Sequence, residues 1–309
     1  MSNKESFKDI VIHLYAIAEG TGHIQRIYNI YDYLNPIYKN IEILIWDPKG
    51  NLSNTITLSK SKVFRTWKEL NFPHLEDNKF IIIADIRDHN PEIFIKLYKK
   101  FKKKILCLDN HFRIKQPEIE NWITLPYVDA KDSLTEILKN HFWNKEFIEV
   151  FLEFETQNID NNVLIYSGIL DHTYNAILKD EENIKTILKA FDLSYEKMDL
   201  IDKKNYSTRW DFYQKFKHSN TIITYPGLLF YEAMFLGKKI IAYDLGSVIH
   251  RKILGLIKHQ YSMYYKGNIK INSYEFFCFD FKNFREKELK DVNLWTSYKK
   301  LKNWIEKNQ

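Results

Sequence analysis

The sequence contains little cysteine, glycine or proline, and it lacks a long hydrophobic run. Its two cysteines, Cys107 and Cys278, stand far apart, which excludes a disulfide framework and a cysteine-based zinc site and suits a reducing cytosol. The low counts of 9 Gly and 7 Pro exclude collagen-like and linker-like chains. No stretch approaches the roughly 20 apolar residues of a membrane span, and residues 1–9 lack the apolar segment of a signal peptide. We therefore expect a soluble, cytoplasmic protein.

Apolar and aromatic side chains are abundant. The chain holds 21 Phe and 20 Tyr, and 45% of its residues are hydrophobic against 28% charged. This composition excludes an intrinsically disordered chain, which carries too little apolar surface to fold. The length of 309 residues allows one large domain or two ordinary ones, at roughly 150 residues each.

The net charge of +6 is concentrated in residues 96–104, a stretch rich in lysine and without arginine. We expect a solvated helix end here, since lysines complement the negative end of the helix dipole. Two alternatives are contact with an anionic membrane surface and binding to nucleic acid. The absence of arginine, the side chain that most often reads bases, leads us to predict no nucleic-acid partner.

Short apolar runs alternate with longer helical patterns along the chain. The predicted strands are Ile10–Ala16, Ile41–Trp46, Phe80–Ala84, Ile105–Leu108, Trp122–Leu125, Val163–Tyr166, Met198–Ile201, Thr221–Thr224 and Lys239–Tyr243. The predicted helices are His23–Leu34, Pro91–Phe101, Asn183–Phe191, Arg209–His218, Leu228–Leu236 and Glu288–Asn308. Runs that are apolar throughout are typical of strands buried on both faces, and strand–helix alternation indicates parallel sheets with crossover helices.

The alternation pauses between about Asp129 and Asn162, in a charged and Phe-rich stretch. We therefore predict an α/β fold with two Rossmann-like domains facing across a cleft. The boundaries are an N-terminal domain over 1–158 and a C-terminal domain over 159–309, whose last helix packs back on the N-terminal domain.

The sharpest local motif is Glu19-Gly20-Thr21-Gly22-His23-Ile24-Gln25-Arg26, directly after the first predicted strand. Ligands of open α/β sheets bind beyond the carboxyl ends of strands, and two glycines let the backbone approach a ligand closely. His23 falls on the first turn of the next helix, whose positive end disfavours imidazolium, so a neutral imidazole is available as a base. A plain turn followed by a helix-capping histidine is the alternative. The third glycine of a dinucleotide fingerprint is missing.

A second motif reads as strand, turn, helix, glycine stop and strand over Thr221–Ile241. Pro226-Gly227 opens the helix, whose N-terminus can hold a phosphate through its free N–H groups. Glu232 lies five residues after Gly227, about 7 to 8 Å along the axis at 1.5 Å per residue. That step suits a carboxylate that accepts hydrogen bonds from the ribose hydroxyls of a nucleotide.

Together the early Gly-x-Gly-His-x-x-Arg and the late Gly-x-x-x-Tyr-Glu-Ala-x-x-x-Gly motifs resemble the GT-B class of nucleotide-sugar enzymes. Within it, the chain resembles the nucleotide-sugar hydrolase of pseudaminic acid biosynthesis (PseG) and its SpsG-type relatives. The strand ends at Ala84-Asp85, Leu108-Asp109-Asn110 and Leu125-Pro126-Tyr127 follow that family's order. The resemblance covers roughly residues 10–128 and 163–250.

The resemblance implies an enzyme of bacterial surface-glycan or nonulosonic acid biosynthesis that hydrolyses a nucleotide-sugar. Its histidine, here His23, activates the water that displaces the nucleotide diphosphate, most often UDP. The residues implied to bind the sugar side are Gly20, Thr21, Gly22, Arg26, Asp85 and Asn110, and those implied to bind the nucleotide are Gly168, Tyr225, Pro226, Gly227, Leu228 and Glu232. No metal or other cofactor is implied, because backbone amides stabilise the leaving diphosphate.

Two segments depart from the family pattern. The Gly-Gly-Ser-Asp-type loop of relatives is Ser167-Gly168-Ile169-Leu170-Asp171 here, and the Asn or Gln pair that faces the sugar is replaced by 244–251, where Ser247 or Arg251 could take its place. Three functions stay open: hydrolysis, transfer of the sugar to an acceptor hydroxyl by a GT-B glycosyltransferase, and non-catalytic binding of a nucleotide-sugar or partner.

Other ionisable residues follow strand ends and are weaker candidates for the site. They are Arg87, Asp88 and His89 after one strand, Asp109 and His111 after the next, and Asp171 and His172 in the second half. None forms a spaced set typical of zinc. No Gly-x-Ser-x-Gly elbow and no P-loop occurs, which excludes these serine hydrolases and the P-loop NTPases.

Overall fold

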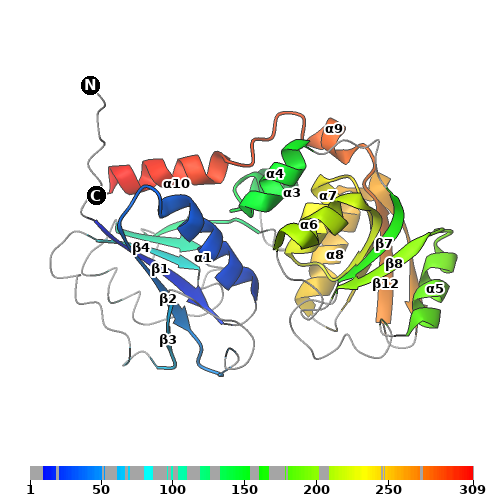
Figure 1. Cartoon of the computed structure of the whole chain (residues 1–309), viewed down its shortest axis with the longest axis horizontal. Coiled ribbons are helices and arrows are strands. Elements are labelled where there is room, and N and C mark those ends of the chain that lie inside the picture. Colours follow the sequence, from blue (N-terminus) through cyan, green and yellow to red (C-terminus); the bar gives the residue numbers. More distant parts are fainter. Residues whose placement is uncertain are drawn as a thin grey trace. The chain divides into compact units, whose positions relative to one another are not determined.

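Two six-stranded sheets with helices around them make up the computed structural model (Figure 1). The structure describes residues 10–18, 21–50, 52, 61–66, 69, 80–85, 96, 99, 104–109, 119–125, 133–153, 160–166, 178, 180–201, 209–244, 246, 248–271 and 274–308. The chain divides into two compact units. Unit 1 comprises Met1–Leu125, Ile137–Asn144 and Asn293–Gln309, and unit 2 comprises Pro126–Glu136 and Lys145–Val292.

The sheet of unit 1 has the strand order β3-β2-β1-β4-β5-β6, and all its strand pairs are parallel. Its elements are β1 (Val11–Ile17), α1 (Thr21–Leu34), β2 (Asn40–Trp46), β3 (Ser61–Phe64), β4 (Phe80–Asp85), β5 (Ile105–Leu108), β6 (Glu120–Trp122) and α10 (Thr296–Lys307). This is the order of a doubly wound Rossmann sheet, in which the strand order reverses between β1 and β4.

The sheet of unit 2 has the order β8-β7-β9-β10-β12-β11. Its elements are α4 (Lys145–Glu153), β7 (Asp160–Tyr166), α5 (Glu181–Ala190), β8 (Lys197–Ile201), α6 (Arg209–His218), β9 (Ser219–Thr224), α7 (Leu228–Phe235), β10 (Lys239–Tyr243), α8 (Val248–Gln260), η5 (Ser262–Tyr264), β11 (Tyr265–Ile271), β12 (Tyr274–Asp280) and α9 (Phe284–Glu288). The helix α3 (Leu134–Lys139) spans the division between the units. The strands β8, β7, β9 and β10 are parallel, and β12 and β11 continue the sheet antiparallel.

The predicted α/β class with two Rossmann-like sheets is confirmed by these topologies. Apolar spacing explains the local structure: α1 buries Ile24, Ile27 and Ile30 at helical intervals, and every residue of β4 is buried. The helix predicted over Pro91–Phe101 falls mostly outside the described residues, although Lys96 and Lys99 are helical.

Three strands, β3, β11 and β12, were not predicted from the sequence. β3 and β11 lie at sheet edges, whereas β12 lies between β11 and β10. β11 alternates half-buried and exposed residues, and β3 is only four residues long, so neither forms the apolar run that marks a central strand. The strand predicted at Trp122–Leu125 instead ends at Trp122. The backbone amides of Thr124 and Leu125 donate to the carboxylate of Asp109 and therefore do not continue the sheet.

The helices α4 and α10 belong to different units. Helix α4 packs in unit 2, where Phe147 contacts Tyr213 and Phe151 contacts Phe235. Helix α10 packs in unit 1 (Figure 1). There the Ser297 hydroxyl donates to the His141 carbonyl, and the Trp304 indole donates to Glu120 at 2.6 Å.

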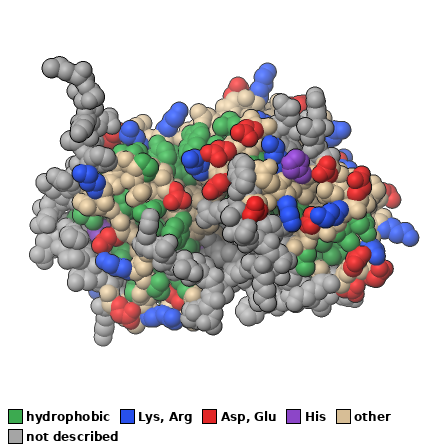
Figure 2. Space-filling view, viewed as in Figure 1, with side chains coloured by type: hydrophobic (Ala, Val, Ile, Leu, Met, Phe, Trp, Pro, Cys, Tyr) green, Lys and Arg blue, Asp and Glu red, His purple; other side chains and the backbone are tan. Residues whose placement is uncertain are grey.

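The described surface carries charges of both signs. In Figure 2 the Lys and Arg side chains on the visible face are interspersed with Asp and Glu and do not form one basic field. Among the described helices, none has the length and apolar character needed to cross a bilayer.

Gly237 ends α7, and its conformation predicts the effect of a substitution. Its φ is +67°, and an added Cβ would lie 3.3 Å from the Phe281 carbonyl oxygen. We expect Gly237→Ala to lower the free energy of unfolding of unit 2 by about 1–2 kcal/mol, the cost of a left-handed backbone for a residue with a Cβ.

Gly255→Ala is the matched control, because Gly255 lies inside α8 and an added Cβ meets nothing within 4 Å. It should raise the free energy of unfolding by about 0.4–1 kcal/mol, since alanine restricts the unfolded chain. Urea unfolding of both variants checks the pair, and equal effects would contradict the role given to Gly237.

Candidate functional site

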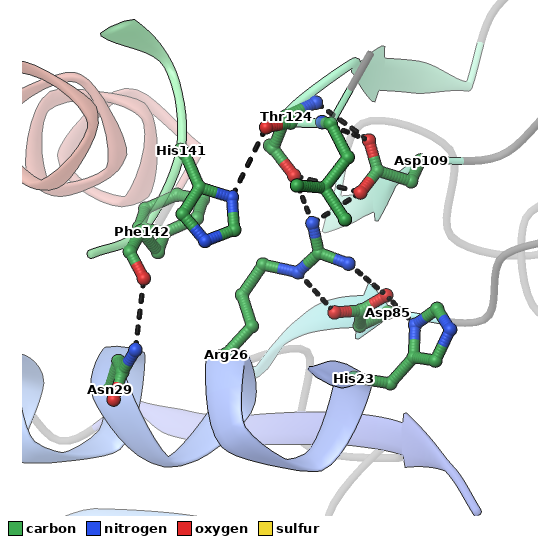
Figure 3. Close-up of polar contacts among 9 residues, drawn as sticks. His23, Arg26, Asn29, Asp85, Asp109, Thr124, His141 and Phe142 are labelled. Atoms are coloured by element: carbon green, nitrogen blue, oxygen red, sulfur yellow. Dashed lines mark hydrogen bonds and ion pairs between the residues drawn. The ribbon is translucent and has the colours of Figure 1, made fainter. Parts of the chain in front are cut away.

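The reversal of strand order between β1 and β4 is the place where a doubly wound sheet binds its ligands, beyond the carboxyl ends of the strands. His23 lies on the first turn of α1, just after β1, and Asp85 is the last residue of β4. The two side chains meet there: His23 Nδ1 lies 2.7 Å from Asp85 Oδ1 (Figure 3).

The His23–Asp85 pair specifies how the imidazole is protonated. Asp85 is completely buried, and burial by itself raises the pKa of its carboxyl group. The charges of Arg26 and then His23, with their hydrogen bonds, outweigh burial and hold the pKa of Asp85 below its ordinary value. An ionised carboxylate can only accept, so Nδ1 of His23 must donate to it. In the neutral ring the lone pair then lies on Nε2, which can take a proton from a substrate or water.

Arg26 lies three residues after His23 on α1 and is 1% exposed. Its Nε donates to Asp85 Oδ2 at 2.5 Å, and its Nη2 donates to Asp85 Oδ1 at 3.2 Å. Its Nη1 donates to Asp109 Oδ2 and to Thr124 Oγ1. The guanidinium therefore bridges the ends of two neighbouring strands, β4 and β5 (Figure 3).

Asp109 completes this network from the residue after β5, in a left-handed conformation with φ +51°. Its Oδ1 accepts from the amides of Thr124 at 2.6 Å and Leu125 at 3.1 Å, and its Oδ2 accepts from the Thr124 hydroxyl at 2.8 Å. Aspartate tolerates the left-handed region better than most residues. This backbone conformation places the fully buried carboxylate of Asp109 within hydrogen-bond distance of Arg26.

His141 borders the network on the other side of Thr124. Its Nδ1 lies 3.1 Å from the Thr124 carbonyl oxygen, and because that oxygen can only accept, Nδ1 is protonated. Burial, followed by the charge of Arg26, lowers the pKa of His141 from 6.5 to about 3. His141 is therefore neutral in the folded protein at neutral pH.

Of the residues predicted to bind the sugar side, some are buried in the network, some lie at the start of α1, and some lie outside the described residues. Arg26 and Asp85 are buried in the network and donate to or accept from its members. Gly22 lies in the first turn of α1, and a Cβ there would meet nothing within 4 Å. Thr21 begins α1, whereas Gly20 and Asn110 lie outside the described residues.

Several of the weaker candidates also lie outside the described residues: Arg87, Asp88, His89, His111, Asp171 and His172. Asp109 is the candidate that the structure joins to His23, through Arg26 and Asp85. Thr124 and His141 were missed, because neither stands in a motif and only the packing of β5, β6 and residues 137–144 brings them to Arg26.

A second group of residues lies at the equivalent reversal in unit 2, between β7 and β9. Tyr166 ends β7, and Tyr225 follows β9, with ring centroids 6.3 Å apart in a stacked arrangement. Tyr225 also contacts Tyr243 and His250, at 6.4 and 5.6 Å between centroids. These rings form an aromatic cluster at the carboxyl ends of three adjacent strands.

The predicted nucleotide-binding residues 225–228 form the turn that opens α7. Gly227 is the N-cap in extended conformation, and no side chain caps the helix. An added Cβ at Gly227 would lie 2.7 Å from Cε2 of Tyr225, so glycine is needed for the close approach of that ring. Pro226 is buried, and Gly227 and Leu228 are half-buried. Gly168 lies outside the described residues.

Glu232 lies one turn further along α7 and is 7% exposed. The Tyr213 hydroxyl of α6 donates to its Oε1 at 2.8 Å. Glu232 is therefore a buried carboxylate with a hydrogen-bond partner from α6. In the part of the chain that the structure describes, no cluster of three or more His, Cys, Asp or Glu is arranged to hold a metal ion.

No protein-family model matches the sequence, and no curated protein matches it. Among solved structures, an α-glucosyltransferase in complex with UDP and a 13-mer DNA containing a HMU base is similar at 10% sequence identity. The similarity covers 96% of this chain and 100% of that chain, with a TM-score of 0.40. A similarity of this size carries no argument about activity or ligand, and the fold assignment rests on the two sheet topologies described above.

One prediction about partners is corrected by this comparison. We predicted that the chain has no nucleic-acid partner, whereas the similar glucosyltransferase was solved with DNA bound. The exclusion of a nucleic-acid partner is withdrawn on this finding, which concerns the glucosyltransferase and assigns no partner to this chain.

The lowered pKa of His141 predicts a pH dependence of stability. The unfolded chain takes up a proton on this histidine near pH 6.5 and the folded chain only near pH 3, so the contribution is complete above pH 6.5 and is lost as the pH falls toward 3. His141→Asn keeps a donor near the Nδ1 position but does not titrate. We expect the variant to lose stability less steeply below pH 6.5, by up to about 1.4 kcal/mol per pH unit.

Urea unfolding between pH 7 and pH 5 measures this slope. His259→Asn, at an exposed histidine near the end of α8, is the control and should retain the wild-type slope. An unchanged slope in His141→Asn would show that His141 is protonated in the folded protein.

Proposed function

We propose that the chain is a nucleotide-sugar enzyme that hydrolyses the bond between the anomeric carbon and the diphosphate. The observation that carries the proposal is the 2.7 Å contact between His23 and Asp85 at the strand-order reversal of unit 1. A histidine whose Nδ1 donates to a buried carboxylate has the tautomer and orientation of a general base. The resemblance to the PseG-like hydrolases assigns the same role to His23.

In the proposed reaction, His23 Nε2 takes a proton from water while the water oxygen forms a bond to the anomeric carbon. The bond from that carbon to the diphosphate oxygen breaks, and its electron pair leaves with the nucleotide. Asp85 stabilises the imidazolium that forms, as an oriented carboxylate does. The imidazolium then returns its proton to solvent.

Unit 2 supplies the nucleotide site in this proposal. The N-terminus of α7 offers backbone N–H groups to the diphosphate, an arrangement suited to anions. Glu232, held by Tyr213, accepts from the ribose hydroxyls, and the Tyr166 and Tyr225 rings offer apolar faces to a base. Helix and backbone amides stabilise the leaving group, so the proposed reaction needs no metal.

His23→Ala tests the base. It should lower kcat by about 10²- to 10⁴-fold while nucleotide affinity stays close to wild type, because the imidazole acts on the proton and not on the diphosphate. The assay follows UDP release from UDP-sugars without acceptor, in the presence of EDTA.

His259→Ala is the control for loss of a histidine and should retain full activity. Full activity in His23→Ala would remove the base assignment. UDP release that occurs only with an added acceptor would assign the same base to a glycosyltransferase, and nucleotide binding without any release would leave a binding protein.

Glu232→Ala tests the nucleotide site. It should raise the donor KM about 10-fold or more and reduce kcat little, since the carboxylate holds a part of the substrate that does not react. Glu182→Ala, at a carboxylate of α5 with 78% of its side chain exposed, is the control in the same unit.

A thermal-shift measurement with UDP, GDP, CDP and CMP gives a second readout. A nucleotide at about 100 times its Kd should stabilise the wild-type protein by roughly 2.7 kcal/mol, and Glu232→Ala should lose most of that shift. An equal shift in the variant would place the nucleotide elsewhere.

A further inference from the structure

The buried network behind His23 carries one more cation and one more carboxylate than a His–Asp pair needs. Arg26 and Asp109 make no direct hydrogen bond to His23 among the described contacts, yet both are at most 1% exposed. Burying an arginine and an aspartate is costly unless each is paired and fully hydrogen-bonded. Their presence calls for a physical role beyond packing.

The charges of the network explain that role. Arg26 binds Asp85 through Nε at 2.5 Å and Nη2 at 3.2 Å, and the latter bond goes to the same Oδ1 that contacts His23. If Arg26 and Asp85 stood alone, the guanidinium would neutralise the carboxylate and leave His23 beside a pair without net charge. An imidazolium formed during the reaction would then gain little stabilisation.

Asp109 changes this balance. Its Oδ2 accepts from Arg26 Nη1, while its Oδ1 is held by two backbone amides. Among the described residues of the network, two carboxylates and one guanidinium leave a net charge of minus one beside His23. Another described neighbour, His141, is neutral at neutral pH, because burial lowers its pKa to about 3. Thr124 bonds both Arg26 and Asp109 and carries no charge.

We propose that Arg26 and Asp109 are positioning residues that act through Asp85: Arg26 orients the Asp85 carboxylate, and Asp109 balances the charge of Arg26 so that one negative charge faces His23. Neither residue contacts the reacting atoms. The inference rests on the proposed function in taking His23 as the base, but its electrostatic content concerns the protonation of His23 and can be measured without substrate.

Three variants test the charge balance: Arg26→Gln, Asp109→Asn and the double variant. Arg26→Gln leaves two negative charges near His23, so His23 should hold its proton to a pH higher than in the wild type by at least about 0.5 unit. Asp109→Asn leaves Asp85 and Arg26, whose charges cancel, so His23 should lose its proton at a pH lower than in the wild type by a similar amount. The double variant restores a net charge of minus one and should titrate close to the wild type.

Proton NMR of the histidine ring Cε1–H signals follows this titration in the whole chain, and the His23 signal is the one missing from His23→Gln. Asparagine tolerates a left-handed backbone as aspartate does, so Asp109→Asn keeps the φ of +51° accessible. The controls are Arg65→Gln, at an arginine of the same unit with 48% of its side chain exposed, and Asp192→Asn, at an exposed aspartate with φ +52°. Neither control should move the His23 titration.

A purely structural role predicts a different pattern, in which every variant impairs the site in the same direction and the double variant is the most impaired. Shifts of one sign, or none beyond the controls, would overturn the proposal. If Arg26→Gln does not fold, Asp109→Asn and the double variant still give a shift and its reversal.

The pH profile of kcat/KM separates this proposal from the proposed function. The acid limb should move to higher pH in Arg26→Gln, to lower pH in Asp109→Asn and back in the double variant, since a base must be unprotonated to act. Opposite NMR shifts in a protein that releases no UDP from any UDP-sugar would uphold the network and reject the hydrolase function. Turnover without opposite NMR shifts would uphold the hydrolase function and overturn the proposed roles of Arg26 and Asp109.

Discussion

The pairing of one buried guanidinium with two buried carboxylates is the interaction on which the described site depends. Arg26 ties the carboxyl end of β4 to that of β5 through Asp85 and Asp109, and it does so from the same helix that carries His23. A charged group in an apolar interior is tolerated only with such complete partners. The geometry of the candidate base is therefore set by electrostatic pairing as much as by packing of the helix on the sheet.

The two units repeat one architectural principle with different chemistry. In each, the strand order reverses beside the first strand of its sheet, and polar or aromatic side chains gather at the carboxyl ends there. Unit 1 presents an imidazole held by a buried charge network, and unit 2 presents an uncapped helix start, a carboxylate and stacked tyrosines.

The central strands and most helices were predictable, because runs such as Phe80–Ala84 and Ile240–Tyr243 are apolar throughout, as strands buried on both faces are. The edge strands β3 and β11 were not, since they are partly exposed and their sequences resemble loops. The strand β12, which lies between β11 and β10, was also missed. The strand expected at Trp122–Leu125 failed for a local reason, because the Asp109 carboxylate takes the amides that would have continued the sheet. No sequence pattern predicts that a side-chain carboxylate will accept the backbone hydrogen bonds that a strand would otherwise make.

The sequence by itself determined the α/β class, the position of His23 at a helix start and the turn at Tyr225-Pro226-Gly227, because hydrophobic period and turn chemistry are local properties. Only the tertiary structure decided that Asp85 contacts His23, that Arg26 lies inside the protein, and that Asp109 and Thr124 accept hydrogen bonds from it. These contacts join residues about 60 to 100 positions apart, and the parallel order of the strands, which no local pattern encodes, brings the network's carboxylates to one edge.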